Sequence, residues 1–251
     1  MDTSERTGCG EISKDWRKPK SMETKTRVGT PWRLVLVGGH TRSIGKTQLV
    51  CDVIRAFPKV CWIAGKITQY GHGVCARNGE NCDCAPTEHA CALDWESRAD
   101  TGTDSARFLE AGAKRSFWLR TKQGRLAEGL PLLREALREA AADIAPETRA
   151  AMIVESNSLM QFLKPSLYFA VIDPDKEDFK ESAQKALDRA NALVLRGGVS
   201  GDAPPAPLWM KLPTKLLREK PSVLQREGEE LPRPLEALVY RMMEEEPAAA
   251  V

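Results

Sequence analysis

The middle of the chain alternates short apolar runs with amphipathic stretches. Runs that read as buried strands lie at residues 33–37, 59–64, 116–119, 150–154, 167–172 and 192–195. Stretches with helical spacing lie between them, at residues 45–57, 103–113, 124–143 and 176–190. Apolar strands that alternate with helices are typical of a parallel sheet covered on both faces. The pattern therefore predicts an α/β fold with a doubly wound, mostly parallel sheet of about six or seven strands.

The two ends of the chain lack this alternation. Residues 1–31 are polar and without a period, and we expect them to form a disordered or loosely attached tail. Residues 32–200 are expected to form the folded domain. Residues 201–251 are expected to form a C-terminal extension, with a short edge strand at 208–212 and a terminal helix at 235–246.

Composition narrows the class of protein. With 251 residues, of which 42% are hydrophobic, the chain can bury a core and suits one α/β domain with tails. Its formal net charge is +2, so nothing in the charge balance requires a nucleic-acid or membrane partner, and we expect neither. There is no run of eighteen apolar residues, and the N-terminus lacks the apolar core of a signal peptide. We therefore expect a cytoplasmic protein.

The stretch RLVLVGGHTRSIGKTQLV, residues 33–50, joins the first predicted strand to the first predicted helix through a glycine-bounded loop. Small residues let backbone N–H groups converge on phosphate oxygens, and a helix N-terminus adds a favourable dipole. Lys46 would reach the terminal phosphates of a nucleotide, and Thr47 would offer a hydroxyl to Mg²⁺. The predicted nucleotide contacts are Gly39, Thr41, Arg42, Ser43, Ile44, Gly45, Lys46, Thr47 and Gln48.

The loop departs from the usual phosphate-loop spacing at His40. The common pattern has four residues between its two glycines, which would put a glycine at position 40. Counting from Gly39, five residues come before Gly45. No Asn-Lys-x-Asp element, which reads guanine, follows any predicted strand, so the expected nucleotide is either GTP or ATP.

Carboxylates follow several of the predicted elements. Glu155 stands directly after the strand at 150–154, where a carboxylate can hold Mg²⁺ through water or polarise an attacking water. Asp104 is a second candidate, although a role as a helix N-cap explains it equally well. Asp173 ends the next strand and is a third candidate for the same cleft. The predicted catalytic residues are Lys46, Glu155 and Asp104, and the predicted magnesium ligands are Thr47 and Glu155.

Residues 66–103 form an insert with neither helical nor strand periodicity, too long for an ordinary connection. Four of the seven cysteines lie in it, with the spacing C-x₆-C-x-C-x₆-C, at Cys75, Cys82, Cys84 and Cys91. Thiolates are strong ligands for Zn²⁺ or an iron–sulfur centre, so we predict such a metal site here, with the metal left open. Free, partly buried thiols or a redox pair are the alternatives. Cys51 and Cys61 lie in a predicted helix and strand and are expected to pack in the core.

The segment TDSARFLEAGA, residues 103–113, resembles the D-S-x-R-x-x-x-A-G-A segment of the MobB-type adaptor proteins of molybdopterin guanine dinucleotide biosynthesis. The matching residues are Asp104, Ser105, Arg107, Ala111, Gly112 and Ala113, and Glu155 stands where that family has the carboxylate of its V-E-G motif. Those proteins are GTP-binding members of the SIMIBI class of P-loop NTPases. The longer loop is similar to that of dethiobiotin synthetase, and a cysteine-bearing P-loop protein also resembles the urease and hydrogenase nickel chaperones of this class.

Two functions follow from these resemblances. The first is a Mg²⁺-dependent GTP- or ATP-binding accessory protein, a slow NTPase that acts as a chaperone in molybdenum-cofactor or other metallocofactor assembly. Its expected partners are the nucleotide and a metalloenzyme or cofactor-synthesis client protein, and a homodimer is left open. The second is an ATP-dependent ligase or small-molecule kinase of the dethiobiotin synthetase kind. The cysteine insert and the D-S-x-R segment favour the first function, whereas the longer loop favours the second.

Overall fold

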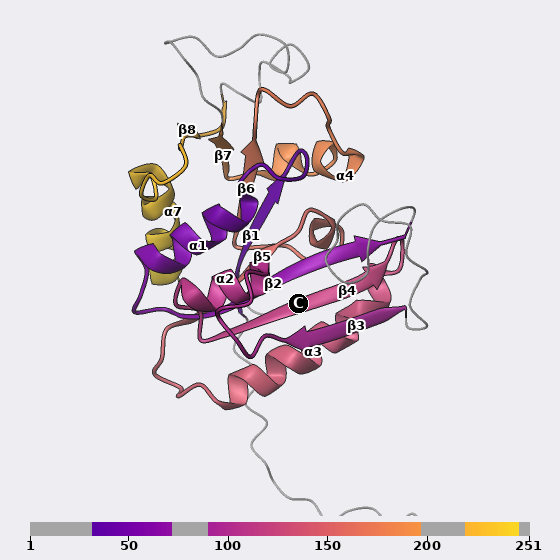
Figure 1. Ribbon diagram of the computed structural model, residues 1–251. Coiled ribbons are helices and arrows are strands. Elements are labelled where there is room, and N and C mark those ends of the chain that lie inside the picture. The colour runs from indigo at the N-terminus through magenta and orange to yellow at the C-terminus, as the bar shows by residue number, and fades with distance from the viewer. Residues whose placement is uncertain (1–31, 72–89, 197–218, 246–251) are drawn as a thin grey trace, which may run out of the picture. The chain divides into compact units, whose positions relative to one another are not determined.

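The computed structural model describes residues 32–71, 90–196 and 219–245. They form an eight-stranded sheet with the order β3-β4-β2-β5-β1-β6-β7-β8 (Figure 1). The strands are β1 Arg33–Gly39, β2 Cys61–Tyr70, β3 Cys91–Trp95, β4 Arg115–Lys122, β5 Ala150–Glu155, β6 Leu167–Ile172, β7 Ala192–Leu195 and β8 Ser222–Leu224. Neighbouring strands are parallel except for β3 and β4. The predicted doubly wound, mostly parallel α/β fold is confirmed, with slightly more strands than predicted.

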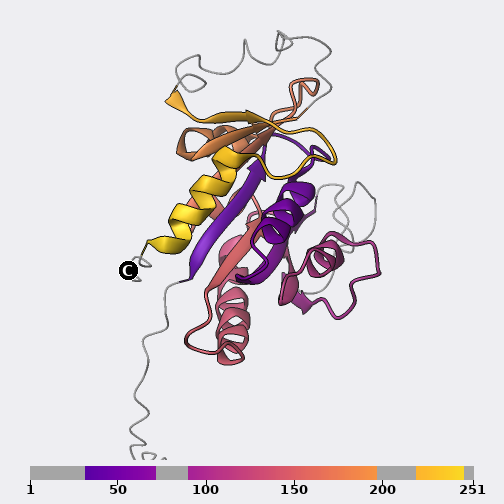
Figure 2. The same ribbon diagram turned by 90° about the vertical axis from the view of Figure 1, so that its left-hand side faces the viewer.

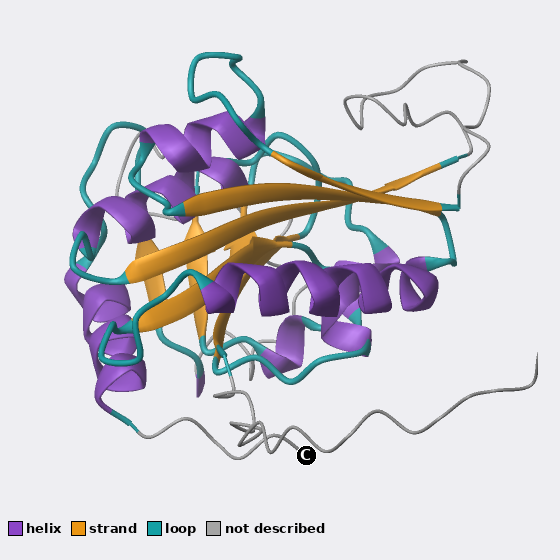
Figure 3. Cartoon of the chain, turned by 90° about the horizontal axis from the view of Figure 1, so that it is seen from below, coloured by secondary structure: helices purple, strands orange, loops and turns teal. Residues whose placement is uncertain are grey.

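Helices cover both faces of the sheet (Figure 1 and Figure 3). They are α1 Lys46–Ala56, α2 Asp104–Glu110, α3 Leu126–Ala142, α4 Glu181–Gln184 and α7 Arg233–Glu244, with short 3₁₀ helices η1 Ser158–Gln161 and η2 Leu187–Arg189. One core cluster joins α1, α2 and α7 to the sheet through residues such as Leu49, Phe108 and Leu235. The other joins α3 and η1 to the sheet through Leu133 and Leu159. No helix in the described segments is long and apolar enough to cross a membrane.

The central strands β5, β1 and β6 end at the same edge of the sheet. Every residue of β6 is buried, and so is nearly all of β5, because both faces of these strands are covered. Val37 of β1 pairs with Glu155 of β5, and Gly39 of β1 pairs with Val171 of β6. The loop after β1 therefore meets Glu155 and the segment after β6 at the carboxyl edge, where α/β sheets bind ligands.

At one side of the sheet, strands β2 and β3 differ from the prediction. The predicted strand ends at Ala64, but β2 continues to Tyr70. Lys66 is the last residue of β2 that pairs with β5. Beyond that point β2 pairs only with β4, and β3 lies on the other side of β4, inside the insert predicted to be irregular. The sequence here lacks the apolar run or alternation that marks a strand, because side chains of this part of β2 line a cleft instead of a core.

The helix predicted at 176–190 is wrong over its first part. Helix α4 begins only at Glu181 and is four residues long, and η2 follows it. Residues 173–180 form neither a helix nor a strand. The backbone N–H of Lys180 donates to the carbonyl oxygen of His40, in the loop after β1, and not to the residue four positions before it.

The described C-terminal segments belong to the same sheet and core. Strand β8 pairs with β7, and α7 begins at Arg233, close to the predicted start at residue 235. Figure 2 shows α7, in yellow, beside β1, and Nε of Arg33 donates to the carbonyl oxygen of Met242 at 3.1 Å. The edge strand predicted at 208–212 lies outside the described residues.

Leu235 tests whether α7 is part of the cooperative fold. Its side chain is fully buried, whereas Tyr240 on the same helix is 61% exposed. We expect Leu235→Ala to lower the free energy of unfolding by about 2–5 kcal/mol, as truncation of a buried leucine does. Tyr240→Ala, the matched control, should change it by less than about 0.5 kcal/mol. Chemical denaturation measures both, and a Leu235→Ala protein as stable as the control would contradict the packing of α7 on the sheet.

Candidate functional site

The loop between β1 and α1 has the backbone geometry of an anion site. Ser43 and Gly45 both have positive φ angles, 49° and 80°, and such left-handed residues turn successive backbone N–H groups toward one concavity. Helix α1 has no side-chain cap at its N-terminus and no acidic residue in its first turn. The first N–H groups of a helix have no acceptor within the helix, so those of α1 are suited to an anion from outside the chain.

Asn157 holds the start of the loop. Its Oδ1 accepts from the backbone N–H of Gly39 at 2.8 Å, and its Nδ2 donates to the carbonyl oxygen of the same residue at 2.7 Å. A Cβ atom on Gly38 would lie 2.2 Å from Oδ1 of Asn157, so only glycine fits there. The sequence prediction missed Asn157, although it comes two residues after Glu155.

His40 ties the loop to the segment after β6. The side chain is almost fully buried, and its ring bonds the backbone of that segment on both sides. Nδ1 accepts from the backbone N–H of Asp173 at 3.4 Å, so Nε2 carries the proton and donates to the carbonyl oxygen of Lys176 at 3.1 Å. Burial lowers the pKa of His40, which favours this neutral form. His40, which stands where the usual loop has a glycine, therefore holds the loop to the segment after β6, and we call these contacts the His40 clasp.

This clasp explains why residues 176–180 are not helical. In a helix, the N–H of Lys180 would donate to the carbonyl oxygen of Lys176. Here it donates to the backbone oxygen of His40 at 2.8 Å, while the oxygen of Lys176 accepts from the His40 ring. Two side chains add to the clasp: Thr41 Oγ1 donates to Asp178 at 2.5 Å, and Nζ of Lys176 donates to the carbonyl oxygen of Ser43 at 2.6 Å.

Lys46, Thr47 and Glu155 meet at the mouth of the loop. Oγ1 of Thr47 donates to Oε2 of Glu155 at 2.6 Å, and Nζ of Lys46 donates to the carbonyl oxygen of Thr41 at 2.7 Å. Burial lowers the pKa of Lys46, and the nearby Glu155 carboxylate opposes this effect. A desolvated lysine beside a hydroxyl and a carboxylate suits a polyanion that arrives with a divalent cation.

Lys66 and Asp104 extend this group of charges. Lys66 of β2 is the register partner of Glu155, and its Nζ bonds Asp104 and lies 3.9 Å from Oε1 of Glu155. Asp104 is not the N-cap of α2, because Thr103 takes that place and accepts from the N–H of Ala106. The sequence prediction missed Lys66, since the strand was expected to end before it.

A chain of polar side chains runs behind the loop along α1. Arg107 of α2 donates to Oε1 of Gln48 at 2.8 Å, and Nε2 of Gln48 donates to Asp52 at 2.7 Å. Gln225, directly after β8, donates to the other carboxylate oxygen of Asp52 at 2.9 Å. Arg196, after β7, donates to the carbonyl oxygen of Gly45 at 3.2 Å. The helix that follows the loop is therefore held on two sides, by α2 and by the β7–β8 edge.

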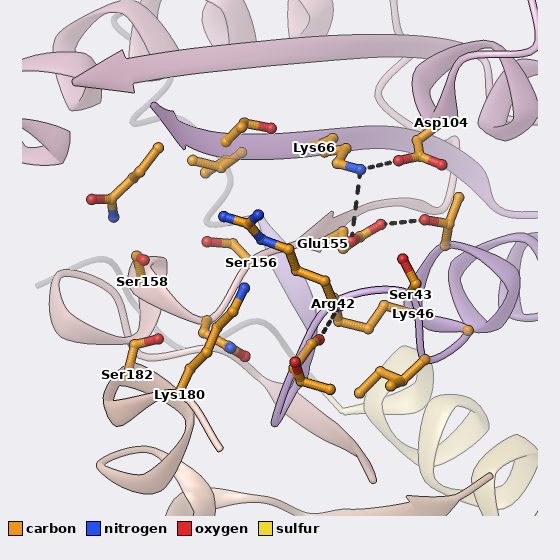
Figure 4. Close-up of a pocket in the computed structure, with 18 of the residues that line it drawn as sticks. Arg42, Ser43, Lys46, Lys66, Asp104, Glu155, Ser156, Ser158, Lys180 and Ser182 are labelled. Atoms are coloured by element: carbon orange, nitrogen blue, oxygen red, sulfur yellow. Dashed lines mark hydrogen bonds and ion pairs between the residues drawn. The ribbon is translucent and has the colours of Figure 1, made fainter. Parts of the chain in front are cut away.

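The loop after β1 lines one cleft of about 1660 Å³ together with Lys66, Asp104 and Glu155 (Figure 4). Its lining contains the predicted residues 41–48, Asp104, Glu155 and Asp173, together with Asn157, Lys66 and Lys180, which the sequence prediction missed. Gly39 lies beneath the loop and does not line the cleft. A Cβ atom there would lie 2.7 Å from Cδ1 of Ile44 and 3.0 Å from the carbonyl oxygen of Val171.

The structure describes only one of the four cysteines that are predicted to bind a metal. Cys75, Cys82 and Cys84 lie outside the described residues, and Cys91 is the first residue of β3, where its Sγ contacts the carbonyl oxygen of Arg125 at 3.6 Å. Within the described segments, no group of three or more His, Cys, Asp or Glu residues is placed to hold a metal ion. The metal site stays a prediction. Cys51 is buried in the core cluster of α1, as expected.

The chain thus has a doubly wound, mostly parallel α/β sheet, with a loop after β1 whose backbone suits a phosphate group. Its sequence matches no family model and no curated protein. Of solved structures, HypB from Helicobacter pylori in complex with nickel aligns with a TM-score of 0.41 and 13% identity, over 86% of this chain and 90% of that one. A Zn(II)-bound triple mutant of the YjiA GTPase aligns with a TM-score of 0.39 and 14% identity, over 82% of this chain and 60% of that one. Identities this low say nothing about function.

The buried His40 predicts a pH dependence of stability. Its pKa is lowered from 6.5 in the folded protein, so the unfolded chain binds more protons near that pH. The stability that depends on neutral His40 is present above about pH 6.5 and is lost as the pH falls below it. We expect the free energy of unfolding of wild type to fall more steeply between pH 7 and pH 5 than that of His40→Gln. Equal slopes in denaturant titrations would contradict the neutral clasp.

Proposed function

We propose that this protein binds a magnesium–nucleoside triphosphate, GTP or ATP, in the cleft and hydrolyses it slowly as an accessory step in metallocofactor assembly. The observation that carries the proposal is the 2.6 Å contact from Thr47 Oγ1 to Glu155, at the N-terminus of the helix that follows the loop. It brings a hydroxyl and a carboxylate from separate elements together beside Lys46. Such a pair, next to a phosphate-binding loop, is what a nucleotide-bound Mg²⁺ requires.

The residues present fit a magnesium ion. Mg²⁺ prefers hard oxygen ligands and is held by one or two protein groups together with phosphate oxygens. Because the hydroxyl of Thr47 donates its proton to Glu155, its lone pairs are left for a cation. Thr47 would bind the ion directly and Glu155 would hold it through water. The ion would neutralise charge that develops on the phosphates.

The chain's own groups would bind and orient the phosphates. Lys46 would exchange its bond to the Thr41 carbonyl oxygen for one to a phosphate, which regains a full charge partner for a desolvated ammonium. Lys66 stands on the other side of Glu155, held by Asp104. Glu155 and Asp104 already accept bonds from neighbouring side chains, which suits orienting water and cation more than rapid proton abstraction. This arrangement supports slow turnover.

The accessory role rests on the insert and on α2. Thr68 and Gln69 of β2 line the cleft, and the cysteine-bearing segment follows β2 directly. We propose that Cys75, Cys82, Cys84 and Cys91 hold Zn²⁺ or an iron–sulfur centre near the nucleotide. The MobB-like residues Asp104 and Arg107 also contact this site, through Lys66 and Gln48. Both features support a role in assembling the molybdenum cofactor, or another metallocofactor, for a client protein.

A second candidate function is favoured by the size of the cleft. Ligand pockets commonly have volumes of roughly 300–1,000 Å³, and this cleft is larger, at about 1660 Å³. It extends past the loop to Gln123, Gly124 and Leu126, around the end of β4 and the start of α3. That space would admit a small acid beside the terminal phosphate, as an ATP-dependent ligase or kinase needs. Phosphate release that depends on a small carboxylic acid would favour this function.

Substitutions at Lys46 and Glu155 separate nucleotide binding from turnover. We expect Lys46→Ala to weaken Mg²⁺–nucleotide binding by about a hundredfold, because it removes a charged phosphate partner. Glu155→Gln should keep affinity within about threefold and lower the hydrolysis rate at least about tenfold, because the amide loses the charge that orients magnesium and water. Lys59→Ala, at an exposed lysine away from the cleft, is the control. Calorimetric titration and phosphate release measure these effects, and wild-type affinity in Lys46→Ala would refute the site.

The cysteine insert is tested by elemental analysis. Wild type prepared anaerobically should carry one zinc, or one iron–sulfur centre, per chain. The double variant Cys82→Ser, Cys84→Ser should lose it, because two of four thiolate ligands are gone. Cys61→Ser, a cysteine of β2 outside the insert, should keep the metal. Metal content should also respond to Mg²⁺–nucleotide if the two sites are coupled. Wild type without stoichiometric metal would end this part of the proposal.

A further inference from the structure

The segment after β6 brings a lysine into the cleft. Residues 173–180 are fixed to the loop by the His40 clasp, and the last of these bonds runs from the backbone N–H of Lys180 to the backbone oxygen of His40 at 2.8 Å. The side chain of Lys180 lines the cleft and points toward the end of Arg42 (Figure 4). The clasp uses only the backbone of Lys180, so it fixes where the side chain starts without using its ammonium group.

The ammonium group of Lys180 faces other cations. Burial disfavours its charged form, and the nearby cations Arg42 and Lys46 add to this effect. Among the described residues, no hydrogen bond or ion pair involves its Nζ, and Asp178 on the same segment accepts from Thr41. Burial and these two cations lower the pKa of Lys180 to about 8. An anion that enters between like charges stabilises them.

We propose that Lys180 is a further phosphate-binding residue, which contacts the outer phosphates of the bound nucleoside triphosphate from the side opposite Lys66. The inference rests on the proposed nucleotide function. A polyphosphate matches this arrangement because it carries several charges and spans more than one cationic group. Lys180 would thus act from within the chain as a charge partner for phosphate, in a place where no sequence motif marks it.

Phosphate binding should change the protonation of Lys180. The charged groups around it are Arg42 and Lys46 from the loop, Asp178 from its own segment and Glu155 from β5. Two of these are cations that disfavour its charged form, and phosphate adds negative charge where they act. The pKa of Lys180 therefore rises on binding, and at pH 8 the complex takes up a proton.

The test is calorimetric titration of the full-length protein at pH 8, with Mg²⁺ and non-hydrolysable GTP or ATP analogues. Two buffers of different ionisation enthalpy report the number of protons taken up. We expect wild type to take up a fraction of a proton more than Lys180→Arg, which is always charged and should keep affinity within about threefold. Lys180→Met should lose about tenfold or more in affinity. Lys185→Met, an exposed lysine paired with Glu181, is the control and should match wild type.

The outcomes separate this inference from the proposed function. If wild type binds no nucleotide, the proposed function and this inference both fail. If wild type binds and Lys180→Met binds equally well with the same proton uptake, only the role of Lys180 is overturned. Equal losses of affinity in the Arg and Met variants would also overturn it, because shape and not charge would then matter. Denaturant unfolding of each variant checks that affinity is compared between equally folded proteins.

Discussion

A loop that binds phosphate through its backbone N–H groups has to be held from outside, because bonds to those groups from within the protein would block the site. In this chain Asn157 brackets Gly39, and the buried His40 clasps the segment after β6. Three features go with these contacts of His40. A histidine stands where the usual loop has a glycine, residues 173–180 cannot form a helix, and Lys180 lies at the cleft. His40 thus connects the loop to the segment after β6, which carries Lys180 to the site.

The sequence predicts best where burial dictates residue type. Strand β6 has the predicted bounds, because a central strand covered on both faces needs an unbroken apolar run. The end of β2 is hidden because polar side chains there line the cleft. Strand β3 is hidden because it is a short edge strand in which no residue is fully buried. The helix predicted at 176–190 fails because bonds to His40 replace its first turn, and such bonds have no periodicity. A local sequence pattern gives no sign of a contact between segments that are far apart in the chain.

The residues of the candidate site likewise fall into those that the sequence predicts and those that it does not. Lys46, Thr47 and Glu155 are visible in the sequence because motif spacing and a strand end mark them. Lys66 and Lys180 are not visible, because their positions depend on strand register and on the clasp. The C-terminal region also reaches the site, since Gln225 bonds Asp52 in the middle of α1. Helix α1, which carries the loop's lysine and threonine, is therefore supported by a residue 173 positions away in sequence.

The proposed nucleotide site depends on Thr47 and Glu155 holding a magnesium ion beside the phosphate-binding loop. A crystal structure of the protein grown with Mg²⁺ and a non-hydrolysable nucleoside triphosphate tests it most directly. We expect phosphate oxygens within hydrogen-bonding distance of the backbone N–H groups of Gly45 and Lys46, and a metal ion bound by the hydroxyl of Thr47. Nζ of Lys46 should leave the carbonyl oxygen of Thr41 for a phosphate. Phosphates bound elsewhere on the protein, with the Lys46–Thr41 and Thr47–Glu155 bonds unchanged, would show that Thr47 and Glu155 do not form this site.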